Sequence, residues 1–474
     1  MTTRVLEQTS VRFARPMRAL GVRVRLYPLW LVLPVAALAS LIVSIVLMRQ
    51  FAAMGIFYLD DTLFNSDPRS MLEVLSQGKR SISILYPELR NSIHPYLWFY
   101  FGPFIRVLAK IAAVTGISQG NEVQLRAVLG TFVIPLISTA QVVAFGLLLK
   151  AMGFCIRHIV LITALNIVAF SNLIFGAIPE HFAISNLALT LLILVAVLSL
   201  RARRMARPWV WISLGLFSAG VTITNAVAFG IVHLSTALQL RFDAAIRTVA
   251  RSFTLALSIA LFVLLSAYAL GFAIDGPLEK GSVRDDFVPR YVRGDVMVWS
   301  APLRALAALG NALAPDRSDI RTVAPIPVPS PYDPALAPPF HESPYPIYTL
   351  EPAPGEAPGI GLLGLIAVVG MALGAGAMVA RGGLWRATAF VALGLIGYNM
   401  ALHLVWGDEF FVYSQHWISP SLLLIAGLLA AAPRAVRPIV EGAFVLFLIA
   451  LAWNNATVIA HVIASARAAA GLMS

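Results

Sequence analysis

Residues 29–48 read LWLVLPVAALASLIVSIVLM, an apolar run that contains no charged residue. A helix needs about 20 consecutive apolar residues to cross the hydrocarbon core of a bilayer. Several runs of similar length follow in a chain that is 59% hydrophobic and 12% charged, with a mean hydropathy of +0.82. A soluble globular domain carries about twice that charged fraction. The sequence therefore predicts an all-α protein that crosses a membrane many times.

The net charge of +12 does not indicate a nucleic-acid partner, because the basic residues cluster between the apolar runs. Cytoplasmic loops of membrane proteins carry lysine and arginine in this way. Cys155 is the single cysteine, which excludes a disulfide within the chain and a cysteine-based metal cluster. The first apolar run is long and lacks a clear small-residue cleavage site, so we expect no cleaved signal peptide.

Arginine-rich segments set the predicted topology. Residues 1–28 hold six arginines against Glu7 and are expected in the cytoplasm, as is the loop of Arg201, Arg203, Arg204 and Arg207. Four crossings join these two segments on one side: 29–48, 127–149, 157–176 and 181–200. A fifth crossing at 95–114 would put the two arginine-rich segments on opposite sides of the membrane. That run carries Arg106 and Lys110 at i,i+4, and we interpret it as a helix lying in the membrane interface.

The remaining chain follows the same alternation. Residues 209–240 are expected to enter and return as two short helices with a break near 222–225. A span at 252–275 leads outward to an external loop at 276–358. Prolines forbid long helices in the second half of this loop, so we expect irregular structure lying over the membrane face. Spans at 359–380, 387–406, 419–433 and 439–455 bring the total to about eleven.

This topology gathers the unusual polar residues on the outer side. They are Asp60, Asp61, His94, Glu180, His181, Asp408, Glu409, Tyr413, Gln415 and His416. The spans are nearly free of charge, and we assign His233, His403 and Glu441 to helix ends or packing. A proton-coupled transporter places ionisable groups near the midplane, so this distribution favours surface chemistry.

Structural roles remain open for several of these residues. Asp60 is suited to capping a surface helix, and Pro179 and Glu180 suit the first turn of another. His94-Pro95 is also compatible with a simple turn at the start of a helix. The aromatic residues within 407–417 are typical of the belts at membrane surfaces.

The order of these motifs resembles the GT-C class of integral membrane glycosyltransferases, which includes protein O-mannosyltransferases and lipid A aminoarabinose transferases. Asp60-Asp61 is similar to the acidic pair near the start of the family's first external loop, and Phe64 follows it. His94-Pro95-Tyr96-Leu97 resembles the family's His-Pro-Pro-Leu-Tyr stretch, and Arg126 resembles the arginine before its second span. Pro179-Glu180-His181-Phe182 takes the place of an acidic-aromatic motif after the third span.

The resemblance covers residues 25–260 by motif and the remainder by layout. It implies a GT-C-like transmembrane module at 29–275 with interfacial helices in a first external loop at 52–126, and C-terminal transmembrane helices at 359–474. It also implies a polyprenyl-phosphate sugar donor and inversion at the anomeric carbon. The family's Thr-Lys appears here as Thr224-Asn225, which departs from its pattern.

Roles follow from this chemistry as expectations. An inverting transfer needs a base for the acceptor hydroxyl, and Asp60 is the candidate, with Asp61 orienting the acceptor or Asp60. The pair is also the candidate for holding a divalent cation, Mg²⁺ or Mn²⁺, if the reaction uses one. The leaving phosphate needs cationic partners. The candidates for binding phosphate or other parts of the substrates are His94, Arg126, Glu180, His181, Lys280, Arg290, Arg293, Tyr413, Gln415 and His416.

Three other functions stay open at this stage. A lipid or lipid-linked sugar flippase or transporter fits the hydrophobicity, and a non-catalytic GT-C-like assembly subunit fits the layout. A glycan polymerase or ligase would share lipid-linked substrates but would centre on a later external loop. For an enzyme, we expect the bacterial inner (cell) membrane and a periplasmic active site that uses a lipid, glycan or protein acceptor.

Overall fold

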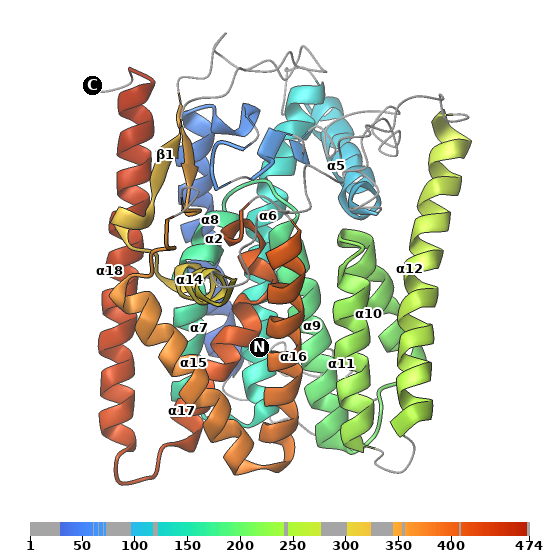
Figure 1. Ribbon diagram of the computed structural model, residues 1–474. Coiled ribbons are helices and arrows are strands. Elements are labelled where there is room, and N and C mark those ends of the chain that lie inside the picture. The colour runs from blue at the N-terminus through green and yellow to red at the C-terminus, as the bar shows by residue number, and fades with distance from the viewer. Residues whose placement is uncertain are drawn as a thin grey trace, which may run out of the picture.

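The protein is a bundle of helices with a small two-stranded sheet at one end (Figure 1). The computed structural model describes residues 29–59, 61–64, 66–69, 71–72, 96–116, 122–240, 245–275, 301–323, 345–352, 356–406 and 409–471. The α-helices are α2 (Leu29–Ala53), α5 (Leu97–Val114), α6 (Glu122–Met152), α7 (Ile156–Val168), α8 (Phe170–Phe175), α9 (Phe182–Ala202), α10 (Pro208–Val221), α11 (Asn225–Leu240), α12 (Ala245–Asp275), α14 (Ala301–Leu313), α15 (Leu362–Arg381), α16 (Gly383–Val405), α17 (Ile418–Ala431) and α18 (Arg437–Ala469). The short elements are the 3-10 helices η1 (Ile56–Tyr58), η5 (Arg317–Asp319) and η7 (Phe411–His416), and the strands β1 (Arg321–Val323) and β2 (Ile347–Thr349).

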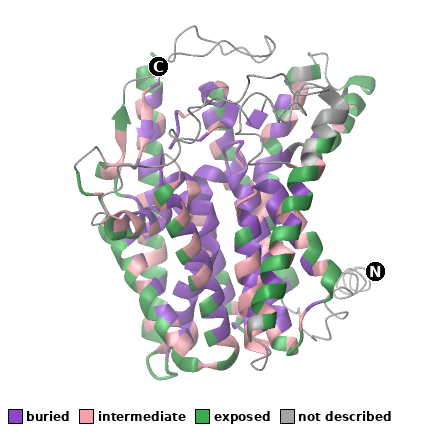
Figure 2. Ribbon diagram, turned by 45° about the vertical axis from the view of Figure 1, so that its right-hand side comes forward, coloured by how far each residue is buried: buried purple, intermediate pink, exposed green. Residues whose placement is uncertain are grey.

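The surface of the bundle is apolar, as expected for contact with lipid. Buried residues gather in its interior, and exposed residues lie on the outward sides of the peripheral helices (Figure 2). Many of the exposed residues are large and hydrophobic, including Val35, Phe253 and Leu446, each with more than 60% of its surface accessible. Soluble monomers rarely expose extended apolar surface of this kind. The chain is therefore an all-α membrane protein.

Each of the eleven apolar runs predicted to cross the membrane coincides with helical structure. Seven helices in the described part of the chain are long and apolar enough to span a bilayer: α2, most of α6, α9, residues 247–266 of α12, α15, α16 and α18. The others are the shorter helices α7, α10, α11 and α17. The predicted break within 209–240 lies between α10 and α11.

The two ends of the bundle differ in composition. One end, which we call the arginine end, carries the connections α6–α7, α9–α10, α15–α16 and α17–α18. There Arg201 donates to the carbonyl of Ala151 at 2.9 Å, and Arg381 donates to that of Ala430 at 2.5 Å. The opposite end, which we call the outer end, carries η1, the starts of α6 and α9, and the β-sheet (Figure 1).

Helix α5 lies at the outer end, next to α6 and above α10 (Figure 1). Its first turn rests on the last turn of α10, because the N–H of Tyr96 donates to the carbonyl of Gly220 at 2.8 Å. A side chain at Gly220 would collide with Tyr96 and Tyr100, so glycine permits this close approach. This position agrees with the prediction that residues 95–114 do not cross the bilayer.

A buried network of uncharged side chains joins six elements in the centre of the bundle. Asn172 and Asn186 lie at its middle, and the amide of Gln415 donates to Asn172 Oδ1 at 2.9 Å. The network also explains why the predicted run 157–176 is interrupted at Ala169, between α7 and α8, where amide side chains replace helical packing. Its members are Gln141, Asn166, Ser171, Asn172, Asn186, Thr190, Ser414, Gln415 and Ser419.

The predicted external loop contains a helix that the sequence analysis missed. Helix α14 is seen nearly end-on in Figure 1, beside α8, and packs against α15 and η7 instead of forming irregular structure over the membrane face. Gly310 and Gly364 let α14 and α15 approach closely, since a Cβ on either glycine would lie within 3.2 Å of the other's backbone. In the second half of the loop, prolines were predicted to forbid long helices, and the described residues there form three-residue strands, in agreement with that prediction.

Asn455 of α18 ties two helix ends together inside the bundle. Its side-chain amide donates to the carbonyl of Val168, which ends α7, at 2.8 Å, and to that of Leu313, which ends α14, at 2.7 Å. The last carbonyls of a helix lack partners within the helix, and in hydrocarbon they cannot use water. Asn455 therefore fixes the depth at which α14 lies in the bundle.

Helices α15 and α17 are in backbone contact at Gly374, which leads to a stability prediction. A Cβ at Gly374 would lie 1.9 Å from the carbonyl oxygen of Leu424. We expect Gly374→Ala to lower the free energy of unfolding by about 1–3 kcal/mol, because the two helices must separate. Thermal unfolding of the purified protein measures this.

Gly376 on the same helix supplies the control. A Cβ there meets nothing within 4 Å, so Gly376→Ala should change stability by no more than about 1 kcal/mol, and upward, because alanine favours a helix. Equal destabilisation by the two substitutions would contradict the predicted contact.

Candidate functional site

The segment 61–69, described except for residue 65, runs across the outer end of the bundle. Its backbone pairs with β2: the N–H of Phe64 donates to the carbonyl of Tyr348 at 2.7 Å, and the N–H of Tyr348 donates to that of Thr62 at 2.9 Å. The N–H of Asp61 donates to the carbonyl of Ser66 at 2.8 Å and closes a tight turn. The carboxylate of Asp61 is therefore carried by backbone that is fixed on both sides.

Two residues of this turn have left-handed backbone conformations. Asp61 has φ 62°, which aspartate tolerates, but Phe64 has φ 53°, which is uncommon for a bulky residue. The ring of Phe64 is fully buried and makes edge contacts with Phe170 and Phe411 at centroid distances of 5.6 and 5.1 Å. Strained backbone of this kind persists where the surroundings fix it, and it concentrates at functional sites.

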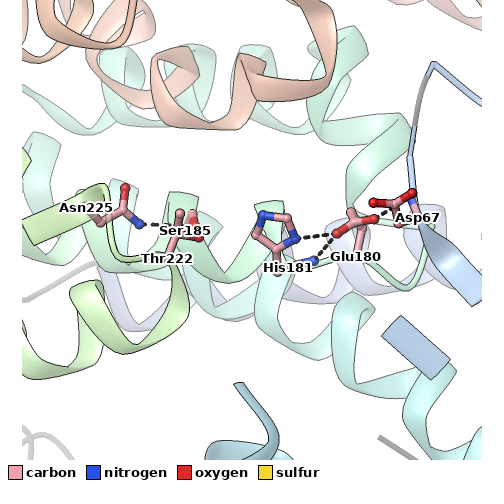
Figure 3. Close-up of polar contacts among 6 residues, drawn as sticks. All are labelled: Asp67, Glu180, His181, Ser185, Thr222 and Asn225. Atoms are coloured by element: carbon pink, nitrogen blue, oxygen red, sulfur yellow. Dashed lines mark hydrogen bonds and ion pairs between the residues drawn. The ribbon is translucent and has the colours of Figure 1, made fainter. Parts of the chain in front are cut away.

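Glu180 connects this segment to the start of α9 (Figure 3). Its Oε2 accepts from the N–H of Asp67 at 2.7 Å, and its Oε1 accepts from the N–H of His181 at 2.9 Å and from Nδ1 of the same histidine. The carboxylate is 2% exposed, and these donors offset the cost of burying its charge. These contacts hold residues 67 and 181 in place, and the predicted role of Glu180 in substrate binding stays a prediction.

The imidazole of His181 is buried beside this carboxylate. Burial lowers the pKa of His181 to about 3, so the ring is neutral at pH 7. Because the carboxylate of Glu180 accepts, Nδ1 carries the proton and Nε2 is left as a hydrogen-bond acceptor. The ring is therefore oriented as in catalytic carboxylate–histidine pairs, in which the acid fixes the tautomer.

A line of hydroxyl and amide groups continues beyond His181 (Figure 3). Ser185 lies one turn further along α9, and its Oγ is 3.3 Å from Oγ1 of Thr222 and accepts from Nδ2 of Asn225 at 3.2 Å. Thr222 ends α10 and Asn225 begins α11, so the break between these helices lies at the same site. Asn225, the second residue of the Thr224-Asn225 pair that departs from the family pattern, is thus joined through Ser185 to α9, one turn from His181.

A third segment, 409–416, approaches from the C-terminal half of the chain. Glu409 accepts from the N–H of Leu350 at 2.9 Å, and the N–H of Phe410 donates to Glu351 at 2.6 Å, which joins this segment to the chain after β2. Phe182 contacts the rings of Tyr413 and His416 at centroid distances of 5.7 and 6.0 Å. The structure therefore brings three of the predicted motifs together.

Gln415 of this segment and His403 of α16 make contacts that the sequence did not predict. Gln415 was expected to bind substrate; its amide nitrogen and oxygen bond Ser171, Asn172 and Asn186 in the central network, and its role in substrate binding stays a prediction. His403 was assigned to a helix end or to packing, and its ring stacks on Tyr413 at a centroid distance of 3.7 Å, with its Nε2 3.3 Å from Nδ1 of His416. Helical periodicity within 383–405 cannot reveal a partner on another segment.

Arg126 forms part of a different group. It pairs with Glu122 one turn earlier on α6, and Arg106 and Lys110 of α5 are close enough to act electrostatically on these residues. These contacts do not test the predicted phosphate role of Arg126, which stays a prediction.

Several predicted residues lie outside the described part of the chain: Asp60, His94, Lys280, Arg290, Arg293 and Asp408. In the ranges that are described, no group of three or more histidine, cysteine, aspartate or glutamate residues is placed to hold a metal ion. Because Asp60 is outside the described residues, the suggested cation site at Asp60 and Asp61 is untested.

Sequence reasoning missed four residues at the site. Asp67 binds Glu180 through its backbone, which leaves no sequence signal, and Arg69 is a buried cation two residues later, 6% exposed. Ser185 could have been found, because it follows His181 at i+4 on one helix face. Thr222 faces Ser185 through a long-range contact that local patterns do not encode.

Comparisons with known proteins do not assign the chain to a family. No protein-family model matches the sequence, and no curated protein is found to be similar to it.

Proposed function

We propose that this protein is an inverting glycosyltransferase that moves a sugar from a polyprenyl-phosphate donor to a hydroxyl on a lipid, glycan or protein. The observation that supports this most is the bond between the Asp67 backbone and Glu180. It fixes the segment that follows Asp60 and Asp61 against the start of α9, where a buried carboxylate–histidine pair lies. Carboxylates and a neutral histidine held together on rigid elements suit proton transfer.

In the proposed reaction, Asp60 takes the proton of the acceptor hydroxyl as its oxygen attacks the anomeric carbon. A new glycosidic bond forms on the face opposite the phosphate, which inverts the configuration. The bond from the anomeric carbon to the phosphate oxygen breaks, and its electron pair leaves with polyprenyl phosphate. Asp61 orients the acceptor.

The growing negative charge on the phosphate needs positive charge or hydrogen-bond donors. Arg69 is a buried cation in the segment that carries Asp61 and Asp67. Lys280, Arg290 and Arg293 are the further candidates named from the sequence. A divalent cation bound by Asp60 and Asp61 would supply the same stabilisation, so metal dependence is part of the test.

The placement of charge supports surface chemistry over transport. Glu441, the one acid noted within a span, lies at the first turns of α18 and pairs with His158 of α7 at 2.8 Å. His233 bonds Ser252 of α12 at 2.8 Å. These partners give both residues structural roles, so neither supports a proton path through the membrane.

Purified protein in liposomes, supplied with polyprenyl-phosphate sugars and a pool of acceptors, tests the proposal. We expect consumption of the donor, release of polyprenyl phosphate and a product with inverted anomeric configuration. Movement of an intact donor between leaflets would instead identify a flippase. Neither cleavage nor movement, with every sugar and cation supplied, would favour the assembly subunit. We further propose that the outer end faces the periplasm of a bacterial inner membrane.

A further inference from the structure

The 3-10 helix η7 presents three edges to the rest of the bundle. Residues three apart in a 3-10 helix lie on the same side of it. Tyr413 and His416 therefore share one edge, which we call the first edge, and both of their rings contact Phe182 at the start of α9. Phe411 and Ser414 share the second edge, and both contact residues of α8. The two candidate substrate-binding residues of the first edge are thus carried by a helix that is held from another side.

Gln415 lies on the third edge of η7 and bonds three residues of the central network. Its Nε2 donates to Oγ of Ser171 at 2.6 Å and to Oδ1 of Asn172 at 2.9 Å. Its Oε1 accepts from Nδ2 of Asn186 at 2.9 Å. The side chain is 2% exposed, and a buried amide that loses its partners is costly where no water can replace them. These three bonds therefore oppose any other position of η7.

Asn186 carries this constraint to the candidate site. It lies one turn after Phe182 on α9, so both side chains are on the same face of that helix. The contact between η7 and α9 thus has two layers. Gln415 bonds Asn186 in the inner layer, and the first edge of η7 packs on Phe182 one turn nearer the outer end. The ring of His181 lies 4.0 Å from that of Phe182, so the inner layer also sets how the first edge lies relative to His181.

We propose that Gln415 is a positioning residue of the transfer reaction. Its amide sets the register of η7 on α9, and it thereby holds Tyr413 and His416 where the substrates meet the pair of Glu180 and His181. This inference rests on the proposed function, and in it Gln415 acts through its neighbours on η7. The amides of the network carry no charge, which suits a buried position in a membrane protein, where ionised groups are costly.

Gln141 of α6 provides a matched control for Gln415. It is also 2% exposed, and it also bonds three residues of the network. Its Nε2 donates to Ser419 at 2.8 Å and to Thr190 at 3.4 Å, and its Oε1 accepts from Asn166 at 3.0 Å. These partners belong to α17, α9 and α7, and none is a residue of η7. Replacing either glutamine with methionine removes three hydrogen bonds and keeps an unbranched side chain of similar length, so we expect the two variants to lose similar stability.

Two measurements on the full-length protein separate positioning from stability. Hydrogen exchange of peptides that cover residues 411–416, followed without any substrate, reports how firmly η7 is held. We expect this exchange to be faster in Gln415→Met and unchanged in Gln141→Met. With donor and acceptor saturating, transfer should fall about 10²-fold in Gln415→Met, the effect of a displacement on the order of 1 Å. Transfer by Gln141→Met should remain close to that of the unmodified protein, and thermal unfolding checks that the two variants are equally stable.

Three results would overturn the proposal. Unchanged exchange at 411–416 in Gln415→Met would show that the amide does not hold η7. Equal loss of transfer in the two variants would reduce Gln415 to a general contribution to stability. Normal transfer by Gln415→Met, despite faster exchange, would show that the reaction does not depend on the position of η7. Absence of transfer by the unmodified protein would instead contradict the proposed function, and the exchange measurement, which needs no substrate, would still decide whether Gln415 holds η7.

Discussion

Replacing Asp60 with asparagine is expected to lower the rate of sugar transfer by about 10²- to 10⁴-fold, the usual contribution of a general base. Asparagine keeps the size of the side chain but cannot accept the acceptor's proton at neutral pH. The loss should appear in the rate of transfer with donor and acceptor both saturating. Release of polyprenyl phosphate by the purified variant, followed over time, measures it.

The matched control for this experiment is Glu356→Gln, which removes an exposed carboxylate that pairs with Arg321, the first residue of β1. Such surface pairs contribute little, so both transfer and stability should remain close to those of the unmodified protein. Transfer by Asp60→Asn at a near-normal rate would remove Asp60 from the base role.

Glu180→Gln should damage both stability and transfer. The amide can place its oxygen toward only one of the two groups of donors, so the N–H of Asp67 or of His181 then faces another donor. We expect the free energy of unfolding to fall by about 1–3 kcal/mol, the cost of leaving a buried polar group unsatisfied.

Transfer by the same variant should fall by about 10²-fold, because releasing the 61–69 segment misplaces the neighbouring carboxylates by a distance on the order of 1 Å. Thermal unfolding and the transfer assay at a temperature well below unfolding separate the two effects. A stable Glu180→Gln protein with normal transfer would show that the Asp67–Glu180 link does not organise the site.

Local patterns in the sequence were sufficient to predict the helical bundle. The length of the apolar runs located the helices. The arginine-rich loops predicted that residues 95–114 lie at the outer end and do not cross the membrane, and the structure has α5 at the outer end. The polar Thr222 to Asn225 stretch correctly predicted the break between α10 and α11, because uninterrupted apolar length is what a long helix needs. These signals are all contained within one run or its flanking loops.

Contacts between distant segments were not predictable in the same way. Helix α14 carries apolar residues on a short stretch within a proline-rich loop, and its position depends on Asn455, more than a hundred residues later. The break between α7 and α8 depends on a network whose members come from six elements. The contacts of His403 and Gln415 were not predicted, because their partners lie on other segments of the bundle.

The candidate site was therefore found in outline. The sequence singled out Asp61, Glu180, His181, Tyr413 and His416, and the structure places all of them at the outer end or at the adjoining start of α9 and η7. It could not predict that Glu180 binds the backbone of Asp67, because any residue at position 67 other than proline would offer the same donor.

The central claim is that Asp60 is reached from the non-cytoplasmic side, and side-specific labelling tests it most directly. Asp60→Cys in a Cys155→Ser background is treated with a membrane-impermeant maleimide from each side of sealed vesicles. The unmodified protein is the reference, because Cys155 is exposed at the arginine end, between α6 and α7. We predict labelling of the cysteine at position 60 from the non-cytoplasmic side and of Cys155 from the cytoplasmic side. Labelling at position 60 from the cytoplasm alone, or from neither side, would contradict the account.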